Sequence, residues 1–190
     1  MTYRDQMAQM AAYRREIGGI RQRMQALAAH VEPEPVEDYT LCDVDGSVSL
    51  SQLFGRQRDL FVIHSMGISC AYCTAWADGF NGVYPHLASR AALCIVGPDD
   101  PALQHTFARE RGWRFRMVSH RNTRFAADLG YQSASGKLLP GLSVLRLEGT
   151  QIVRVADAAS RPGDDFSPLC RLFELLPGGW GDWTPKLSYP

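Results

Sequence analysis

Two cysteines stand three residues apart where an apolar run gives way to a predicted helix. Cys70 and Cys73 follow Leu60–Ile63, a predicted buried strand, and they open a stretch of helical character that extends to about Leu87. Zinc knuckles and haem attachment sites use the same spacing, so the spacing alone does not identify the chemistry. The strand before the pair and the helix after it are more restrictive. They place both thiols in the first turn of a helix that leaves a sheet.

The rest of the chain alternates between predicted strands and helices. Strands are expected at 39–43, 48–50, 60–64, 91–96, 115–118, 142–147 and 152–155. Helices are expected at 70–87, 101–111, 123–129 and 166–176. This order, which finishes with a hairpin and a helix, predicts an α/β domain with a central mixed sheet covered by helices on both faces. It is the order found in thioredoxin-like proteins.

Residues 1–36 are predicted to form a helical arm followed by an acidic linker. Apolar residues recur at steps of three and four, which predicts one stripe along a long helix. Gly18-Gly19 is expected to weaken the centre of this helix, and Pro33 and Pro35 to stop it. The stripe would pack on the chain's own domain or form the seam of a homodimer. Its residues are Met10, Tyr13, Ile17, Ile20, Met24, Leu27 and Val31.

The expected domain covers residues 37–178, and residues 179–190 form a tail rich in aromatic side chains. Trp180, Trp183 and Tyr189 are too many aromatics for a plain solvated end. We therefore expect the tail to dock on the body of the domain or on a second subunit.

Composition limits the classes of partner. Twenty basic residues balance twenty acidic ones, so bulk charge does not draw the chain to nucleic acid or to an anionic membrane. We see no signal peptide and no spanning segment, which predicts a cytoplasmic protein. Five cysteines, an odd number, favour a reducing compartment in which a disulfide is transient and catalytic. Cys42, Cys94 and Cys170 are expected to be small buried apolar residues.

The helix start gives the two cysteines different expected roles. Unpaired N–H groups and the helix dipole stabilise a thiolate in the first turn, which makes Cys70 the expected nucleophile. Cys73, one turn deeper, would resolve the mixed disulfide. The alternative is a pair of inert structural thiols.

Two further residues are candidates for the site. His64 ends the strand six residues before Cys70 and could move a proton from the deeper cysteine, or it could be structural. Pro140 precedes the strand 142–147, where thioredoxin-like proteins place a cis-proline beside the cysteine pair. We expect Pro140 to be cis and to shape a substrate groove; the alternative is an ordinary trans proline.

The segment from Cys70 to Gly82 resembles a bacterial thioredoxin-like family of unknown function, described as predicted dithiol-disulfide oxidoreductases. That family reads much like Cys-x-x-Cys-x-x-Trp-Ala-Asp-x-Phe-x-Gly, and the resemblance spans most of the chain. It implies Cys70 and Cys73 as the redox pair. Tyr72 and Trp76 are candidates for lining the substrate surface, although Trp76 could instead belong to the core. The loop 64–69 looks shorter than in many relatives, and Ala71-Tyr72 leaves the direction of electron flow open.

The residues leave rival functions open. A peroxiredoxin-like thiol peroxidase would need a proline seven residues, and a Ser or Thr three residues, before the attacking cysteine; Ile63 and Gly67 stand there. A metal-binding module would need two more ligands from His64, His86 or Cys94. A third alternative is a binding scaffold that keeps the fold without turnover. Haem attachment fails because Thr74 stands where histidine is required. The favoured function is thiol-disulfide exchange with a protein or small-molecule disulfide, without a bound organic cofactor, recharged by an unidentified redox partner.

Overall fold

The computed structural model describes residues 1–190, apart from the side chain of Pro168. The chain divides into two compact units, Met1–Pro33 and Glu34–Pro190. Among the residues described, no helix combines the length and the apolar character needed to cross a bilayer.

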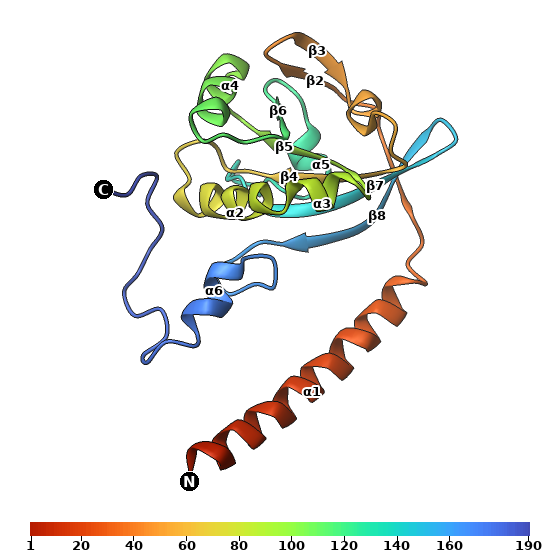
Figure 1. Ribbon diagram of the computed structural model, residues 1–190. Helices are drawn as coiled ribbons and strands as arrows, with labels where there is room; N and C mark the ends of the chain where they lie inside the picture. Colours follow the sequence, from red (N-terminus) through yellow and green to blue (C-terminus); the bar gives the residue numbers. More distant parts are fainter. The chain divides into compact units, whose positions relative to one another are not determined.

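The first unit is one helix, α1 (Tyr3–Ala28), drawn in red and orange in Figure 1. Thr2 caps it by accepting the backbone N–H of Asp5, whose carboxylate accepts the N–H of Thr2 in return. The helix continues through Gly18 and Gly19, because each glycine costs only about 1 kcal/mol in a long helix. Packing of its apolar stripe on the chain's own domain or on a second copy stays a prediction. Four stripe residues are 45% to 63% exposed: Tyr13, Ile17, Ile20 and Met24.

An eight-stranded mixed sheet organises the second unit, in the order β1-β8-β7-β4-β5-β6-β2-β3 (Figure 1). Strands β4, β5 and β6 are parallel to one another, and the other neighbouring pairs are antiparallel. The predicted mixed α/β fold is confirmed. The strands are β1 (Glu34–Val36), β2 (Thr40–Asp43), β3 (Gly46–Ser49), β4 (Asp59–His64), β5 (Ala92–Gly97), β6 (Arg116–Ser119), β7 (Gly141–Glu148) and β8 (Gln151–Ala159).

Short helices connect the strands. The stretch predicted as a helix at 70–87 is two helices, α2 and α3, separated at Val83. Asp100 is the N-cap residue of α4, and Pro101 is its first residue. The helices are η1 (a 3-10 helix, Ser51–Phe54), α2 (Ala71–Gly82), α3 (Tyr84–Ala88), α4 (Pro101–Glu110), α5 (Phe125–Asp128) and α6 (Pro168–Phe173).

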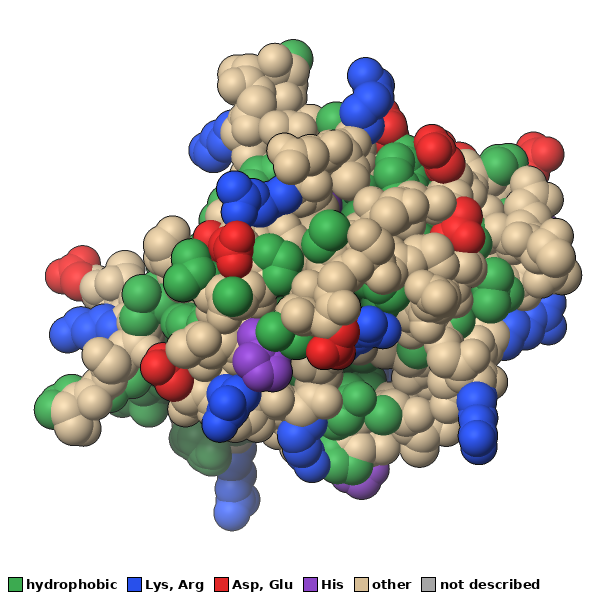
Figure 2. All heavy atoms as spheres, turned by 90° about the horizontal axis from the view of Figure 1, so that it is seen from above, with side chains coloured by type: hydrophobic (Ala, Val, Ile, Leu, Met, Phe, Trp, Pro, Cys, Tyr) green, Lys and Arg blue, Asp and Glu red, His purple; other side chains and the backbone are tan. Residues whose placement is uncertain are grey.

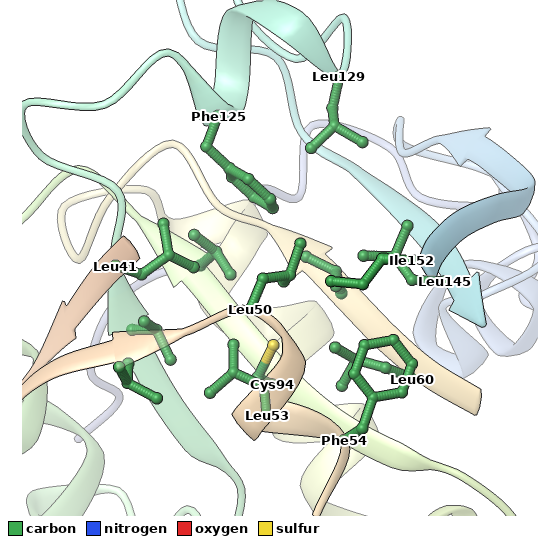
Figure 3. Close-up of a cluster of buried hydrophobic side chains, with 14 of the residues drawn as sticks. Leu41, Leu50, Leu53, Phe54, Leu60, Cys94, Phe125, Leu129, Leu145 and Ile152 are labelled. Carbon is green, nitrogen blue, oxygen red and sulfur yellow. The ribbon is translucent and has the colours of Figure 1, made fainter. Parts of the chain in front are cut away.

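Apolar side chains form one cluster on each face of the sheet. The larger cluster, shown in Figure 3, joins the sheet to η1 and α5. The smaller cluster joins it to α2 and α3 through residues such as Ala77 and Phe80. Because side chains alternate along a strand, Val62 of β4 belongs to the first cluster and Ile63 to the second. Labelled members of the larger cluster are Leu41, Leu50, Leu53, Phe54, Leu60, Cys94, Phe125, Leu129, Leu145 and Ile152.

Part of the expected linker is a strand. Residues 34–36 form β1, which pairs with β8 so that Val36 lies opposite Ile152, and the Glu34 carboxylate binds Arg154. Pro35 is tolerated because β1 is an edge strand. The pairing partner lies more than a hundred residues away in sequence, so local patterns do not reveal it.

Acidic and basic side chains are interspersed on the face of the molecule shown in Figure 2. This agrees with the balanced composition of the chain, in which formal positive and negative charges cancel.

Candidate functional site

Cys70 is the N-cap residue of α2, at the end of the loop that leaves β4. Its Sγ accepts the backbone N–H of Cys73 at 3.1 Å, and its carbonyl oxygen accepts the N–H of Thr74 at 2.9 Å and the Thr74 hydroxyl at 3.0 Å. The Cys70 sulfur therefore acts as the side-chain cap of α2. Both cysteines are free thiols, Cys70 half-buried and Cys73 buried.

The two thiols have opposite electrostatic environments. Hydrogen bonding from the Cys73 thiol, supported by the backbone N–H groups of Cys73 and Tyr72, lowers the pKa of Cys70 to about 7. The same hydrogen bond, together with burial, raises the pKa of Cys73 far above its usual range. Near pH 7, about half of the Cys70 thiol is therefore ionised, whereas the buried Cys73 stays protonated.

The loop between β4 and α2 is held by its own Ser65 and by Asp99 in the loop that follows β5. An Asp99 carboxylate oxygen accepts the N–H of Ile68 at 2.8 Å, and Ser65 Oγ accepts the N–H of Gly67 at 3.1 Å. Gly67 has φ +121, and a Cβ there would meet the Asp99 carboxylate at 3.1 Å. Glycine is needed at this position for both reasons. The Gly67 carbonyl then accepts the N–H of Cys70, which fixes the attacking cysteine to the loop.

His64 does not face the cysteine pair, contrary to the proton-transfer role considered for it. Its ring stacks on Tyr131, with centroids 3.6 Å apart, and lies 5.7 Å from Phe125, on the face of the sheet opposite α2. Its Nε2 is 3.0 Å from Ser143 Oγ. Burial lowers the pKa of His64 to about 3, so the ring is neutral at physiological pH. The geometry supports the structural alternative.

The expectation of a cis-proline at Pro140 is wrong, because every peptide bond among the described residues is trans. The Pro140 carbonyl accepts the N–H of Ser160 at 3.0 Å, which continues the β7–β8 ladder beyond Gly141. A trans bond keeps the chain extended as it enters β7. Pro140 still lies at the end of the sheet that carries the site, since Gly141 pairs with His64 in β4.

Trp76 belongs to the interior and is no exposed platform, since it is 7% exposed. It also lines a narrow pocket with Tyr72 on one side and Cys170, Trp180 and Trp183 on the other. The C-terminal tail therefore docks on the body, against the outer side of the cysteine-bearing helix. Tyr72 is half-buried there, and its contact with substrate stays a prediction.

Asp78 links α2 to the tail through Arg111. The Asp78 carboxylate accepts two hydrogen bonds from the Arg111 guanidinium, at 2.5 and 3.1 Å, and one from Trp113 Nε1 at 2.8 Å. Arg111 also donates to the Leu187 carbonyl at 2.8 Å. Asp78 thus positions the tail and neither caps a second helical segment nor touches the cysteine pair.

The remaining cysteines and histidines do not complete a metal site. Cys94 and His64 lie on the face of the sheet opposite α2, and His86 is an exposed residue of α3. No cluster of three or more potential metal ligands occurs among the described residues. Cys94 and Cys170 are buried, as predicted, whereas Cys42 is half-buried.

Ser65 and Asp99 are site residues that the sequence patterns did not single out. Ser65, Ser160 and Cys73 line a small cavity of about 20 Å³ at the inner side of α2. Strand alternation could have found Ser65, because it stands two residues after Ile63, whose side chain faces α2. Asp99 carries no comparable signal, since its contact with Ile68 joins two separate loops.

Three solved structures show the same fold. The peroxidoxin BcpB from Mycobacterium tuberculosis is 23% identical, with a TM-score of 0.56 over 67% of this chain and 84% of that chain. A peroxiredoxin-like protein from Aquifex aeolicus is 14% identical, with a TM-score of 0.55 over 67% of this chain and 74% of that chain. Reduced Prx3 in complex with hydrogen peroxide, from Vibrio vulnificus, is 13% identical, with a TM-score of 0.53 over 70% of this chain and 90% of that chain. At these identities the likeness concerns the fold alone.

No curated protein matched the sequence. A family model did match, and it covers residues 4–187, which is nearly the whole chain. The chain therefore belongs to the family described as bacterial protein of unknown function, DUF899.

Proposed function

We propose that the protein is a thiol-disulfide oxidoreductase in which Cys70 attacks a substrate disulfide and Cys73 resolves the mixed disulfide. The observation that carries this proposal is the opposed ionisation of two thiols one helical turn apart. Cys70 has a pKa lowered to about 7 and is half-buried, whereas Cys73 is buried and has a raised pKa. Two inert structural thiols would not require such different pKa values.

In the first step, the Cys70 thiolate attacks one sulfur of the substrate disulfide. A new bond forms between Cys70 Sγ and that sulfur, the substrate S–S bond breaks, and the other half leaves as a thiolate. The backbone N–H groups of Tyr72 and Cys73 stabilise the Cys70 thiolate before the attack. Cys70 is the only one of the two sulfurs with substantial exposure.

In the second step, Cys73 gives its proton to water or to the substrate thiolate released in the first step, and the Cys73 thiolate attacks Cys70 Sγ. The Cys70–Cys73 disulfide forms and the remaining half of the substrate leaves as a thiolate. Once Cys70 is in the mixed disulfide, it no longer accepts a hydrogen bond from Cys73, which removes the largest cause of the raised pKa. The Met66 backbone N–H and the Ser65 side chain both lower the pKa of Cys73 and remain in place. We assign Ser65 the stabilisation of the Cys73 thiolate by hydrogen bonding.

The two sulfurs hold the electrons, so the reaction needs no bound organic cofactor. A dithiol partner would reduce the Cys70–Cys73 disulfide, or a disulfide oxidant would regenerate it, according to the direction of flow. The substrate class is a protein or small-molecule disulfide that reaches the start of α2, beside Tyr72.

Insulin reduction in the presence of dithiothreitol tests the proposal. The wild type is expected to accelerate precipitation of the insulin chains, and Cys70→Ser is expected to be inactive. Cys94→Ser is the matched control, because Cys94 is 1% exposed in the core away from α2. Equal rates for the wild type and Cys70→Ser would refute catalysis by this pair.

A thiol peroxidase is the second candidate, and the peroxiredoxin fold of the similar structures favours it. In that reaction, the Cys70 thiolate would take one oxygen of a hydroperoxide and release the alcohol or water. Cys73 would then condense with the sulfenic acid, with loss of water. Stopped-flow mixing with hydrogen peroxide separates the candidates. Rapid, Cys70-dependent peroxide consumption, together with inactivity toward insulin, would replace the first proposal with the second.

A further inference from the structure

The second unit contains an apolar cavity of about 460 Å³ behind the cysteine-bearing helix. Its walls come from the end of α2, from α3, and from the centre of the sheet in β4, β5 and β7. The loop before α6 closes one side. The apolar lining includes Phe61, Ile63, Phe80, Leu87, Leu93 and Leu142.

The cavity opens to solvent beside Val83 and Phe166, which are 47% and 40% exposed. Small organic ligands occupy clefts of about 300–1,000 Å³ with a mainly apolar lining, and this cavity falls in that range. Phe61, Phe80, Leu87 and Leu142 are only partly buried although they adjoin the core cluster around Ile63. The sheet and α2 therefore leave apolar surface that the domain does not fill.

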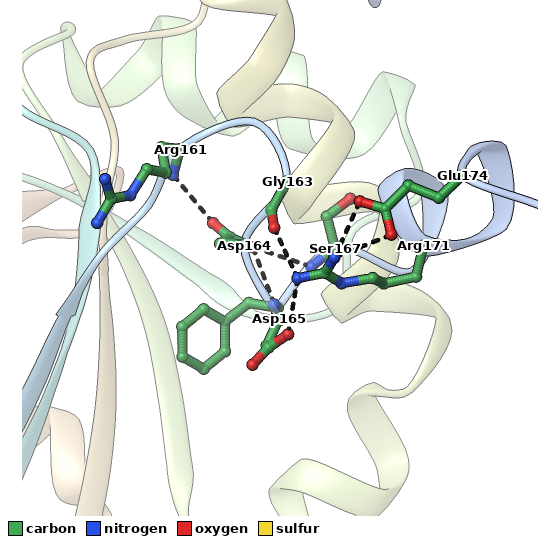
Figure 4. Close-up of polar contacts among 8 residues, drawn as sticks. Arg161, Gly163, Asp164, Asp165, Ser167, Arg171 and Glu174 are labelled. Atoms are coloured by element: carbon green, nitrogen blue, oxygen red, sulfur yellow. Dashed lines mark hydrogen bonds and ion pairs between the residues drawn. The ribbon is translucent and has the colours of Figure 1, made fainter. Parts of the chain in front are cut away.

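The loop that closes the cavity is internally organised, as Figure 4 shows. The carboxylate of Asp164 accepts the backbone N–H groups of Arg161 at 3.0 Å, Phe166 at 2.9 Å and Ser167 at 3.2 Å. Phe166 and Ser167 line the cavity. One carboxylate thus gives the wall a defined conformation.

Arg171 is the cationic residue at the cavity, and its charge is already used within the loop. The guanidinium donates to both carboxylate oxygens of Glu174 at 2.9 Å, to Asp165 at 3.0 Å and to the Gly163 carbonyl at 2.8 Å (Figure 4). An anionic ligand would have to displace these contacts beside two carboxylates. The wall therefore disfavours binding of an anionic ligand, while burial of apolar ligand surface against the apolar lining favours binding.

We propose that this cavity is a binding site for a neutral, apolar organic molecule, held against α2 and the sheet. The proposal is independent of the redox function assigned to Cys70 and Cys73. The cavity is nevertheless next to that site, because Ile63 and Phe80 also line the small cavity beside Cys73. A bound molecule would rest on the helix that carries both thiols.

Fluorescence titration of the full-length protein with two related dyes tests the proposal. Phenylnaphthylamine is neutral, and anilinonaphthalene sulfonate has the same aromatic skeleton with an added sulfonate. The neutral dye is expected to bind saturably at one site, and at least about tenfold more tightly than the sulfonate. Cys70→Ser is expected to bind it like the wild type, which separates this proposal from the redox function.

Val83→Trp places a large side chain at the cavity wall and is expected to weaken binding of the neutral dye by about tenfold or more. Val44→Trp is the matched control, because Val44 lies in the turn between β2 and β3 and is 49% exposed, against 47% for Val83. Val83→Arg, which needs no space inside the cavity, is the second variant if Val83→Trp does not fold. Absence of saturable binding, unchanged affinity in the folded Val83 variant, or tighter binding of the sulfonate would overturn the proposal.

Discussion

Replacing Cys73 with alanine tests why Cys70 is reactive. The Cys73 thiol is the largest cause of the lowered pKa of Cys70, and the backbone N–H groups of Cys73 and Tyr72 come after it. Cys73→Ala removes the thiol and keeps both N–H groups. Burial raises the pKa of Cys70 and opposes these N–H groups, so the pKa is expected to rise from about 7 toward its ordinary value of 9.0.

The size of the effect follows from two opposing changes. If the pKa rose fully, the thiolate fraction at pH 7 would fall from about one half to about one hundredth. A more basic thiolate is more nucleophilic. With a Brønsted coefficient of about 0.45, a rise of two pKa units increases the rate constant of the thiolate itself about eightfold. The net rate of alkylation at pH 7 then falls about sixfold, or about twofold if the N–H groups preserve half of the shift. At high pH, where both proteins are ionised, the variant should react faster.

The assay is the alkylation rate of Cys70 by iodoacetamide across about pH 5 to 10, read from the Cys70 peptide by mass spectrometry. Cys73→Ser is the matched control, because its hydroxyl can still donate a hydrogen bond and should keep the pKa of Cys70 low. The account requires the wild-type and Cys73→Ala rate curves to cross. Curves that coincide, or an alanine variant with the lower pKa, would show that Cys73 does not stabilise the Cys70 thiolate.

Three other predictions concern the fold around the site. Burial keeps the pKa of His64 near 3, whereas it is about 6.5 in the unfolded chain. The neutral ring therefore stabilises the fold fully above about pH 6.5, and the free energy of unfolding falls by about 1.4 kcal/mol per pH unit between about pH 6.5 and 3. Urea unfolding of His64→Phe should lack this acid slope, and an unchanged slope would contradict a buried neutral ring. Asp59→Asn should lower the free energy of unfolding at pH 7 by about 1–3 kcal/mol, since the Asp59 carboxylate accepts a charged hydrogen bond from Arg146 at 2.8 Å; equal denaturant midpoints would count against this. Trp183→Ala should speed alkylation of buried Cys170 by loosening the tail, and protection equal to the wild type would argue against that docking.

Much of the fold could be predicted because its signals are local. Apolar runs with turn residues between them predict β4 and β5, and the helix expected at 101–111 is α4. The position of Cys70 after a strand predicts the start of α2. The spacing also predicts Cys73 as the deeper thiol, and Cys73 is buried whereas Cys70 is half-buried.

Distance in sequence alone does not say which face of the sheet a residue occupies. His64 is only six residues from Cys70, but strand alternation places its side chain on the face with Val62, away from α2. The same alternation favours Ser65. The cis expectation for Pro140 rests on fold analogy, and the β7–β8 pairing that extends to a trans Pro140 cannot be read from the sequence.

The central claim is that Cys70 attacks and Cys73 resolves, and single-turnover reaction with dithiobisnitrobenzoic acid tests it most directly. In a Cys42→Ser background, which removes the other free thiol that is only half-buried, the protein should release two equivalents of chromophore and finish with a Cys70–Cys73 disulfide. Cys73→Ser should release one equivalent and retain the other as a mixed disulfide on Cys70, identified by peptide mass. A wild-type protein that keeps the adduct, or an adduct on Cys73 in the Cys70→Ser variant formed at the wild-type rate, would contradict the account.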